Sequence, residues 1–211
     1  MRIDLITMKD GNEILLPQPE CLRDCITLIQ SDMFRCVGRV VSVKHIIFQA
    51  LFHPFKNPLL WFRLCRCRGL IFHIAVRMWK KCQMIYKIDM PFSTRVGFGL
   101  YIGHGICIVI NGRTVIGNNV NLSQFLNIGT NHESPAVIGD NVYIGPMVCL
   151  IEDVQIGKNS KIGAGAVVTK DVPENCVAVG IPAKKIKQSD SPNTNCWKLP
   201  EYKESSRWLD I

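Results

Sequence analysis

The 211-residue chain contains no run of eighteen or more apolar residues, although 47% of its residues are apolar. A helix needs about 20 consecutive apolar residues to cross a bilayer, so the sequence predicts no membrane-spanning helix. The chain starts Met-Arg-Ile-Asp, and this acid stands where a signal peptide would have its apolar stretch. We therefore expect a cytoplasmic protein.

The sequence also lacks the pattern of a zinc site, although it has ten cysteines. No paired C-x-x-C set is accompanied by histidines at zinc-binding spacing. Thiols stay reduced in a chain without an export signal, and a buried cysteine behaves as a small hydrophobic residue. We expect free, structural cysteines and no metal.

Acidic residues are missing from residues 33–87, which hold eleven Lys and Arg residues. The net charge of +8 at pH 7 therefore originates in this segment. Apolar residues such as Trp61, Phe72 and Trp79 are interleaved with the basic ones, a composition typical of a helix on an anionic membrane surface. The alternative is a cap on the end of a solenoid. No nucleic-acid partner is expected, because no recognised binding fold accompanies the charge.

The expected organisation has three parts. Residues 1–88 form a basic N-terminal region, helical from about residue 13, with Pro17, Pro54 and Pro58 as punctuation. Residues 89–187 form a repeat domain, and residues 188–211 form a tail. The tail has a polar linker followed by aromatic residues, which favour docking onto the rest of the chain. These aromatic residues are Trp197, Tyr202 and Trp208.

A six-residue period runs through the repeat domain, in which an aliphatic residue is usually followed by glycine. The aliphatic series is Val96, Ile102, Ile108, Ile116, Leu122, Ile128, Ile138, Ile144, Leu150, Ile156, Ile162 and Val168. Hexapeptide repetition is typical of a parallel β-helix, in which three hexads close one triangular coil. Inward side chains then stack at the spacing of neighbouring strands, about 4.8 Å. The predicted fold is mainly β, with an N-terminal helical region.

Two intervals in this series are longer than six residues. Ile108 to Ile116 is eight residues, and Ile128 to Ile138 is ten. Extra residues cannot enter a stacked core, so they must leave it as loops. We expect the second loop, the polar residues 130–135, to overhang a ligand groove.

Five stretches of the repeat domain carry a family pattern. They are Asp89 eight residues before Gly97, Val96-Gly97-Phe98-Gly99-Leu100-Tyr101-Ile102-Gly103-His104, Leu122-Ser123-Gln124, Ile162-Gly163-Ala164-Gly165-Ala166-Val167-Val168, and Val179-Gly180-Ile181-Pro182-Ala183-Lys184. These stretches resemble the hexapeptide-repeat acyltransferases, and Asp89 with His104 resembles their serine acetyltransferase-like branch. The resemblance implies a left-handed β-helix and a homotrimer. It also implies transfer of an acetyl group from acetyl-CoA to a hydroxyl, in a groove between subunits.

By resemblance, His104 is the catalytic base and Asp89 is the carboxylate that orients it. A thioester is already activated, so the reaction needs little beyond one base near the hydroxyl, and an imidazole of pKa near 6.5 suits that task. A structural, hydrogen-bonded histidine is the alternative. His132, in the polar loop, competes as an acceptor-binding residue or as the base, and Gln124 is a further acceptor-binding candidate. His45, His53 and His73 lie in the basic region, where packing or exposure explains them more easily.

Candidates for contact with acetyl-CoA follow from position along the repeats. Its amide-bearing arm could bond to exposed backbone at small corner residues, although coil geometry explains the glycines equally well. These candidates are Gly129, Gly145, Gly163 and Ala164. Lys184 and Lys185, with Lys187, could meet the phosphates.

Two departures from the serine-specific pattern concern the acceptor. Gly103 replaces the acid that directly precedes the histidine, and Glu133-Ser134 replaces an Arg-His pair. The charged ends of an amino acid need charged partners once they leave water. We therefore expect a sugar hydroxyl of polysaccharide or lipid-linked oligosaccharide synthesis, made at the membrane face. Serine O-acetylation in cysteine biosynthesis is the alternative, and a non-catalytic scaffold leaves Asp89 together with His104 unexplained.

Overall fold

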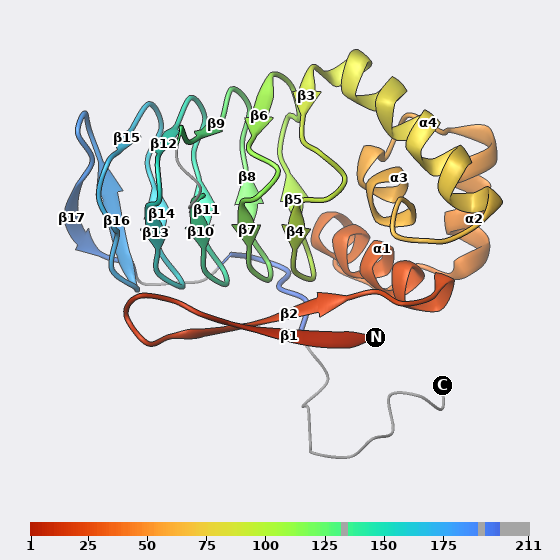
Figure 1. Cartoon of the computed structure of the whole chain (residues 1–211), viewed down its shortest axis with the longest axis horizontal. Coiled ribbons are helices and arrows are strands. Elements are labelled where there is room, and N and C mark those ends of the chain that lie inside the picture. Colours follow the sequence, from red (N-terminus) through yellow and green to blue (C-terminus); the bar gives the residue numbers. More distant parts are fainter. Residues whose placement is uncertain (132–134, 190–192, 199–211) are drawn as a thin grey trace.

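A computed structural model describes residues 1–131, 135–189 and 193–198. Four helices gather at one end of a β-solenoid, and a hairpin runs lengthwise along it (Figure 1). The helices are α1 (Leu22–Val37), α2 (Val43–Phe52), α3 (Pro58–Leu64) and α4 (Leu70–Tyr86). No helix in these ranges is long and apolar enough to cross a bilayer.

Three sheets of short strands form the walls of the solenoid. The first, here the β4 sheet, contains β4 (Arg95–Val96), β7 (Val115–Ile116), β10 (Val137–Ile138) and β13 (Gln155–Ile156). The β5 sheet contains β5 (Tyr101–Ile102), β8 (Asn121–Leu122), β11 (Tyr143–Ile144), β14 (Lys161–Ile162), β16 (Cys176–Val179) and β17 (Lys184–Gln188). The β3 sheet contains β3 (Ile88–Asp89), β6 (Ile108–Ile110), β9 (Asn127–Gly129), β12 (Cys149–Ile151) and β15 (Val167–Val168). All pairs are parallel except β16 with β17, so the predicted parallel β-helix is confirmed.

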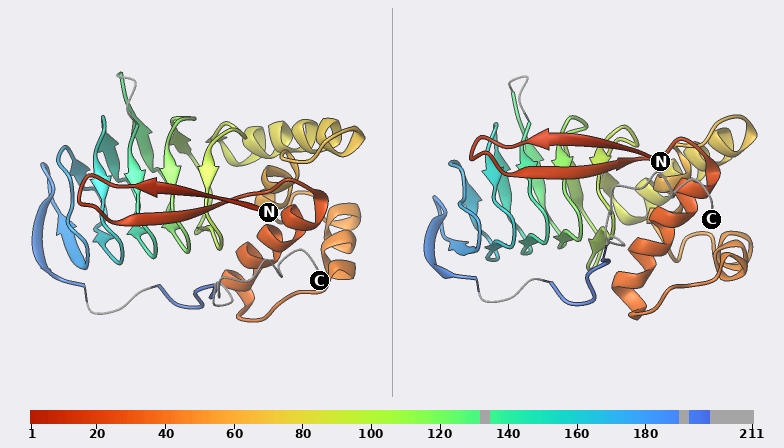
Figure 2. Two further views of the ribbon diagram at one scale, coloured as in Figure 1. Left: turned by 60° about the horizontal axis from the view of Figure 1, so that its bottom comes forward. Right: turned by 90° about the horizontal axis from the view of Figure 1, so that it is seen from below.

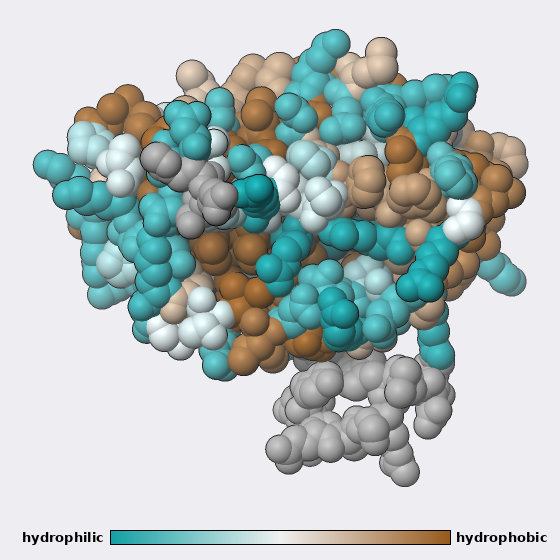
Figure 3. Space-filling model, viewed as in Figure 1, coloured by the Kyte–Doolittle hydropathy of each residue, from teal (hydrophilic) through white to brown (hydrophobic). Residues whose placement is uncertain are grey.

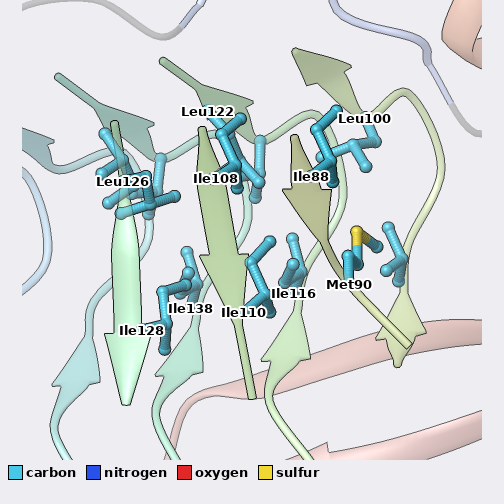
Figure 4. Packing of buried hydrophobic residues seen from close by; sticks show 14 of the residues in the cluster. Ile88, Met90, Leu100, Ile108, Ile110, Ile116, Leu122, Leu126, Ile128 and Ile138 are labelled. Carbon is cyan, nitrogen blue, oxygen red and sulfur yellow. The ribbon is translucent and has the colours of Figure 1, made fainter. Parts of the chain in front are cut away.

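Stacked aliphatic side chains fill the solenoid. Ile116, Ile138 and Ile156 lie one above another in register and are fully buried. Figure 4 shows the same inward packing for Leu122, Leu126 and Ile128. Because each coil buries a few large side chains, most of the folding free energy comes from contacts between successive coils.

Ile110, and not Ile108, holds the repeat position in the first coil. Strand pairing places Ile110 beside Ile128, while Ile108 lies beside Ile88. Both isoleucines are buried, and Val109 between them is 42% exposed, so the six-residue count could not choose between them. The expected loop between Ile108 and Ile116 was therefore wrong. The two extra residues lie earlier, in the corner between Ile102 and Ile108.

The first eighteen residues form a hairpin instead of the start of the helical region. β1 (Arg2–Thr7) pairs antiparallel with β2 (Glu13–Gln18). Ile14 and Leu16 point inward and pack with Val115, whereas Leu15 between them is exposed. The prediction of a helix from residue 13 was wrong. The alternation of buried and exposed residues is too short to predict a strand by itself, and Pro17 argues against one. Figure 2 shows the hairpin lying across successive coils, where it covers the β4 sheet.

An asparagine ladder marks the corner between the β4 and β5 sheets. Asn119, Asn141, Asn159 and Asn175 have φ between 52° and 59°, a conformation that asparagine tolerates better than most residues. Asn141 Nδ2 donates to Asn159 Oδ1 at 3.1 Å, and Asn159 Nδ2 donates to Asn175 Oδ1 at 2.9 Å. The tail docks at the end of this ladder, where the Trp197 backbone N–H donates to Asn119 Oδ1 at 2.7 Å. Tyr202 and Trp208 lie outside the described residues.

The helices close the N-terminal end of the solenoid through a buried ion pair. Arg63 on α3 bonds Asp32 on α1 through Nε and Nη2 at 2.8 and 2.9 Å. Arg63 also donates to the carbonyls of Val96 and Gly97, and Asp32 accepts from the Leu100 backbone N–H at 2.8 Å. The helices of the basic region therefore cap the end of the solenoid, which is one of the two roles proposed for this region from the sequence.

Candidate active site

His104 lies on the two-residue insertion in the corner between β5 and β6. The corner is anchored by Ile102 before it and by the buried Ile108 after it. His104 has φ of 49°, in the left-handed region, and its side chain is exposed. The insertion thus holds the imidazole outside the prism, where a ligand can reach it.

Asp89 lies on the neighbouring strand at the same end of the solenoid. It follows the buried Ile88 on β3, is exposed, and pairs in register with Val109. The Cys107 backbone N–H donates to the Tyr86 carbonyl at 3.0 Å, so both strands begin at the corner that carries His104. Within the described ranges no hydrogen bond joins the Asp89 and His104 side chains. Catalytic hydrogen bonds are often long without substrate, so their pairing stays a prediction.

Gln124 and Ala164 share the edge that starts at His104. Ile102 pairs with Leu122, Leu122 with Ile144, and Ile144 with Ile162. Residues two positions after Leu122, Ile144 and Ile162 therefore stack along one edge, about 4.8 Å apart per coil. They are Gln124, Pro146 and Ala164. The Phe125 N–H donates to the Ile106 carbonyl as the Met147 N–H donates to that of Gln124, so Ile106 begins this column, directly after the insertion that carries His104. Gln124 and Ala164 therefore share one edge although they lie forty residues apart in the sequence, and His104 lies in the insertion at the start of this edge.

The backbone N–H groups of two glycines beside this edge already donate hydrogen bonds within the solenoid. The Gly145 N–H donates to the Ile162 carbonyl, and the Gly163 N–H donates to the Ala178 carbonyl. These two N–H groups are therefore not available to a ligand, and contact of Gly145 and Gly163 with acetyl-CoA stays a prediction. A Cβ on Gly145 would lie 2.8 Å from the Ile162 carbonyl oxygen, so coil geometry explains this glycine. Both residues can still help a ligand by leaving the edge without side chains.

Gly129 and the polar loop do not lie on the His104 edge. Gly129 ends β9, and the chain then crosses from the β3 sheet to the β4 sheet. The chain therefore leaves the coil after Gly129 at a different corner from His104, where Thr130 Oγ1 donates to Glu152 Oε2 at 3.0 Å. His132, Glu133 and Ser134 lie outside the described residues.

Lys184 and Lys185 lie at the far end of the sheet that begins beside His104. Both are exposed on β17, which pairs with β16. The β5 sheet contains six strands, so five strand spacings of about 4.8 Å, or roughly 24 Å, separate β5 from β17. A long, extended ligand could therefore contact both His104 and these cations.

The outer face of the β3 sheet is mostly apolar, a feature that the sequence analysis missed. Its exposed apolar side chains, with those of the adjoining corner, are Ile106, Val109, Phe125, Met147 and Ile151, and the polar Asp89 and Asn127 are exposed beside Val109. Cys107, Phe125, Met147 and Gly165 have positive φ and stack at this corner. The signal was present in the sequence, because Phe125 and Met147 stand at turn positions where small or polar residues are usual. The hairpin covers the β4 sheet, whereas nothing in the described chain covers this face.

All ten cysteines are free, and several are too deeply buried to serve as nucleophiles. Burial raises the pKa of Cys65 to about 12 and that of Cys82 to about 11. Burial also raises the pKa of the Cys25 thiol, which lies 3.5 Å from the Cys67 sulfur. These thiols remain protonated at neutral pH and fill the core.

Comparisons with known proteins identify relatives along the repeats. Residues 135–170 match the family model described as bacterial transferase hexapeptide (six repeats). The chain is 39% identical over 137 residues to a Saccharomyces cerevisiae protein named "Putative acetyltransferase YJL218W", covering 54% of this chain and 70% of that protein. It is 33% identical over 146 residues to the mitochondrial serine acetyltransferase 3 of Arabidopsis thaliana, covering 65% of this chain but 37% of that enzyme.

A solved structure shares the fold as well. The crystal structure of Neisseria gonorrhoeae serine acetyltransferase in complex with serine superposes with a TM-score of 0.58 at 26% identity. The superposition covers 78% of this chain and 68% of that one.

Proposed function

Because the chain belongs to the hexapeptide-repeat acetyltransferases, we propose that it moves an acetyl group from acetyl-CoA to a hydroxyl, with His104 as the general base. The observation that carries this proposal is the exposed imidazole on the corner insertion, at the start of the edge that holds Gln124 and Ala164. The uncovered apolar face lies beside that corner.

In the proposed reaction, the hydroxyl oxygen attacks the thioester carbonyl carbon. His104 takes the hydroxyl proton as the new C–O bond forms. The C–S bond then breaks, and the imidazolium returns the proton to the CoA thiolate, so that atoms and charge balance. Asp89 would hold the imidazole in one tautomer and stabilise its transient positive charge. Ala164 would flank the arm of acetyl-CoA, and Lys184 and Lys185 would meet its phosphates.

The apolar face next to His104 supports a homotrimer in which each site is completed by a neighbouring copy. Contiguous exposed apolar side chains are typical of protein interfaces. Contact through Phe125 and Met147 would bring a second chain alongside the His104 edge.

We expect Met147→Glu to shift the protein from trimer toward monomer, because the charge would be buried at the interface without a partner. Light scattering after size-exclusion chromatography measures the mass directly. Leu5→Glu is the matched control, since Leu5 is 53% exposed on the hairpin and Met147 is 65% exposed on the apolar face. An unchanged mass for Met147→Glu would contradict the interface.

The serine acetyltransferase relatives support L-serine as the acceptor, against the sugar that the sequence analysis preferred. A sugar hydroxyl remains the second candidate on one specific observation. Gly103 adds no charge beside His104, and the first two residues of the edge, Ile106 and Gln124, are both neutral. An amino acid would have to find its charged partners elsewhere in the site.

Acetyl transfer with each acceptor tests the function. Loss of thioester absorbance and mass spectrometry of the acetylated product avoid interference from the ten cysteines of the chain. We expect O-acetylserine to form from acetyl-CoA and L-serine. Acetylation of a hexose or an oligosaccharide without O-acetylserine would establish the second candidate. No acetylation of any acceptor, together with no binding of CoA, would leave a scaffold.

A further inference from the structure

Helix α2 carries an apolar face that no other part of the described chain covers. Ile46 is the only buried residue of the helix. Five apolar side chains at helical spacing are between 43% and 69% exposed, and these residues define the α2 face: Val43, Ile47, Phe48, Leu51 and Phe52. The Phe48 and Phe52 rings lie 4.9 Å apart between centroids, so they form one continuous surface.

This face lies at the end of the molecule opposite β17. Figure 1 places α2 there, beside the start of α4, and Figure 3 shows apolar residues gathered at the same end. The first turns of α4 add Leu70, Ile71 and Ile74, of which Leu70 is 75% exposed. The site edge that starts at His104 belongs to the solenoid, so the α2 face is separate from it.

The described charged residues that flank the α2 face in the sequence are all basic. Its exposed basic neighbours in sequence are Arg39, Lys44, Lys56 and Arg68. Residues 33–87 contain no acid, and the two acids of α1 are already engaged. Asp32 pairs with Arg63, and Asp24 pairs with the chain's N-terminus at 3.1 Å. These acids therefore cannot neutralise the basic residues around the face.

We propose that the α2 face docks on an anionic lipid surface. The apolar side chains would enter the boundary between headgroups and acyl chains, and the basic residues would meet lipid phosphates and carboxylates. The helix has ten residues and is therefore about 15 Å long, too short to span a bilayer. Docking of a second copy on this face is disfavoured, because it would bring like-charged borders together with no acid between them.

Binding to lipid vesicles tests the proposal without requiring acetyl transfer. The full chain is sedimented with vesicles of phosphatidylcholine alone or of phosphatidylcholine with phosphatidylserine. We expect binding to the anionic vesicles only, weakened by added salt. The double variant Phe48→Ser, Leu51→Ser should reduce that binding by at least about 10-fold, because it removes two of the inserted side chains. Leu5→Ser is the matched control, because Leu5 is as exposed as Phe48 but lies on the hairpin.

Three outcomes would overturn the proposal. The first is no binding to anionic vesicles. The second is equal binding by the double variant, which would mean attraction by general positive charge alone. The third is a lower oligomeric mass for the double variant without lipid, which would assign the face to a second copy. Activity on a soluble acceptor should be unchanged in the double variant, so failure here is distinguishable from failure of the proposed function.

Discussion

Replacing His104 with alanine is expected to lower kcat for acetyl transfer by about 10²- to 10⁴-fold, the usual contribution of a general base. The imidazole is exposed on a corner insertion and has no packing role in the described structure, so its loss should leave the thermal unfolding midpoint unchanged. Steady-state kinetics with the preferred acceptor measures the effect. His73→Ala is the matched control, since His73 is also exposed but lies on α4.

The same kinetics separates His104 from its competitors. Asp89→Asn should also lower kcat, because the amide cannot stabilise the imidazolium, yet it should retain more activity than His104→Ala. If His104→Ala keeps most of the wild-type rate while His132→Ala loses it, the base is His132 and the assignment is wrong. Near-wild-type rates in both variants would remove the histidine mechanism altogether.

The sequence predicted the solenoid because its period is enforced by stacking. Ile116, Ile138 and Ile156 must all point inward and lie in register, so a six-residue repeat leaves few other folds. The register of the first coil could not be read in the same way. Ile108 and Ile110 are both aliphatic and two residues apart, so each satisfies an inward position. With Ile108 taken as the repeat position, the insertion is expected after Ile108. It lies before Ile108 instead, and it carries His104.

The sequence could predict the position of a site residue only where that residue stands at a fixed distance from an inward residue of the six-residue repeat. Gln124 and Ala164 fall on the His104 edge because each stands two positions after an inward residue. Residues 130–135 escape this rule, since a loop can leave from any corner without changing the period. The hairpin was missed for a related reason: Ile14 and Leu16 alternate over too few residues to predict a strand. Pairing with β1 and contact with Val115, both long-range, decide its conformation.

Replacing Asp32 with alanine is expected to lower the free energy of unfolding by about 3–5 kcal/mol, because it leaves the Arg63 guanidinium buried without its counter-ion. The two side chains are 2% and 3% exposed. Burial raises the pKa of Asp32, while Arg63 opposes that shift. The Leu100 N–H would also lose its acceptor, so the first coil should loosen where the helices cap it. Urea denaturation followed by circular dichroism measures the change.

An exposed ion pair supplies the control for this prediction. Lys158 and Glu174 lie 3.2 Å apart with side chains 48% and 40% exposed, and Glu174→Ala should cost no more than about 1 kcal/mol. The double variant Asp32→Leu, Arg63→Met should recover part of the loss, since no unpaired charge remains buried. Recovery should be incomplete, because Arg63 also bonds the carbonyls of Val96 and Gly97. An Asp32→Ala variant as stable as Glu174→Ala would show that the cap does not depend on this ion pair.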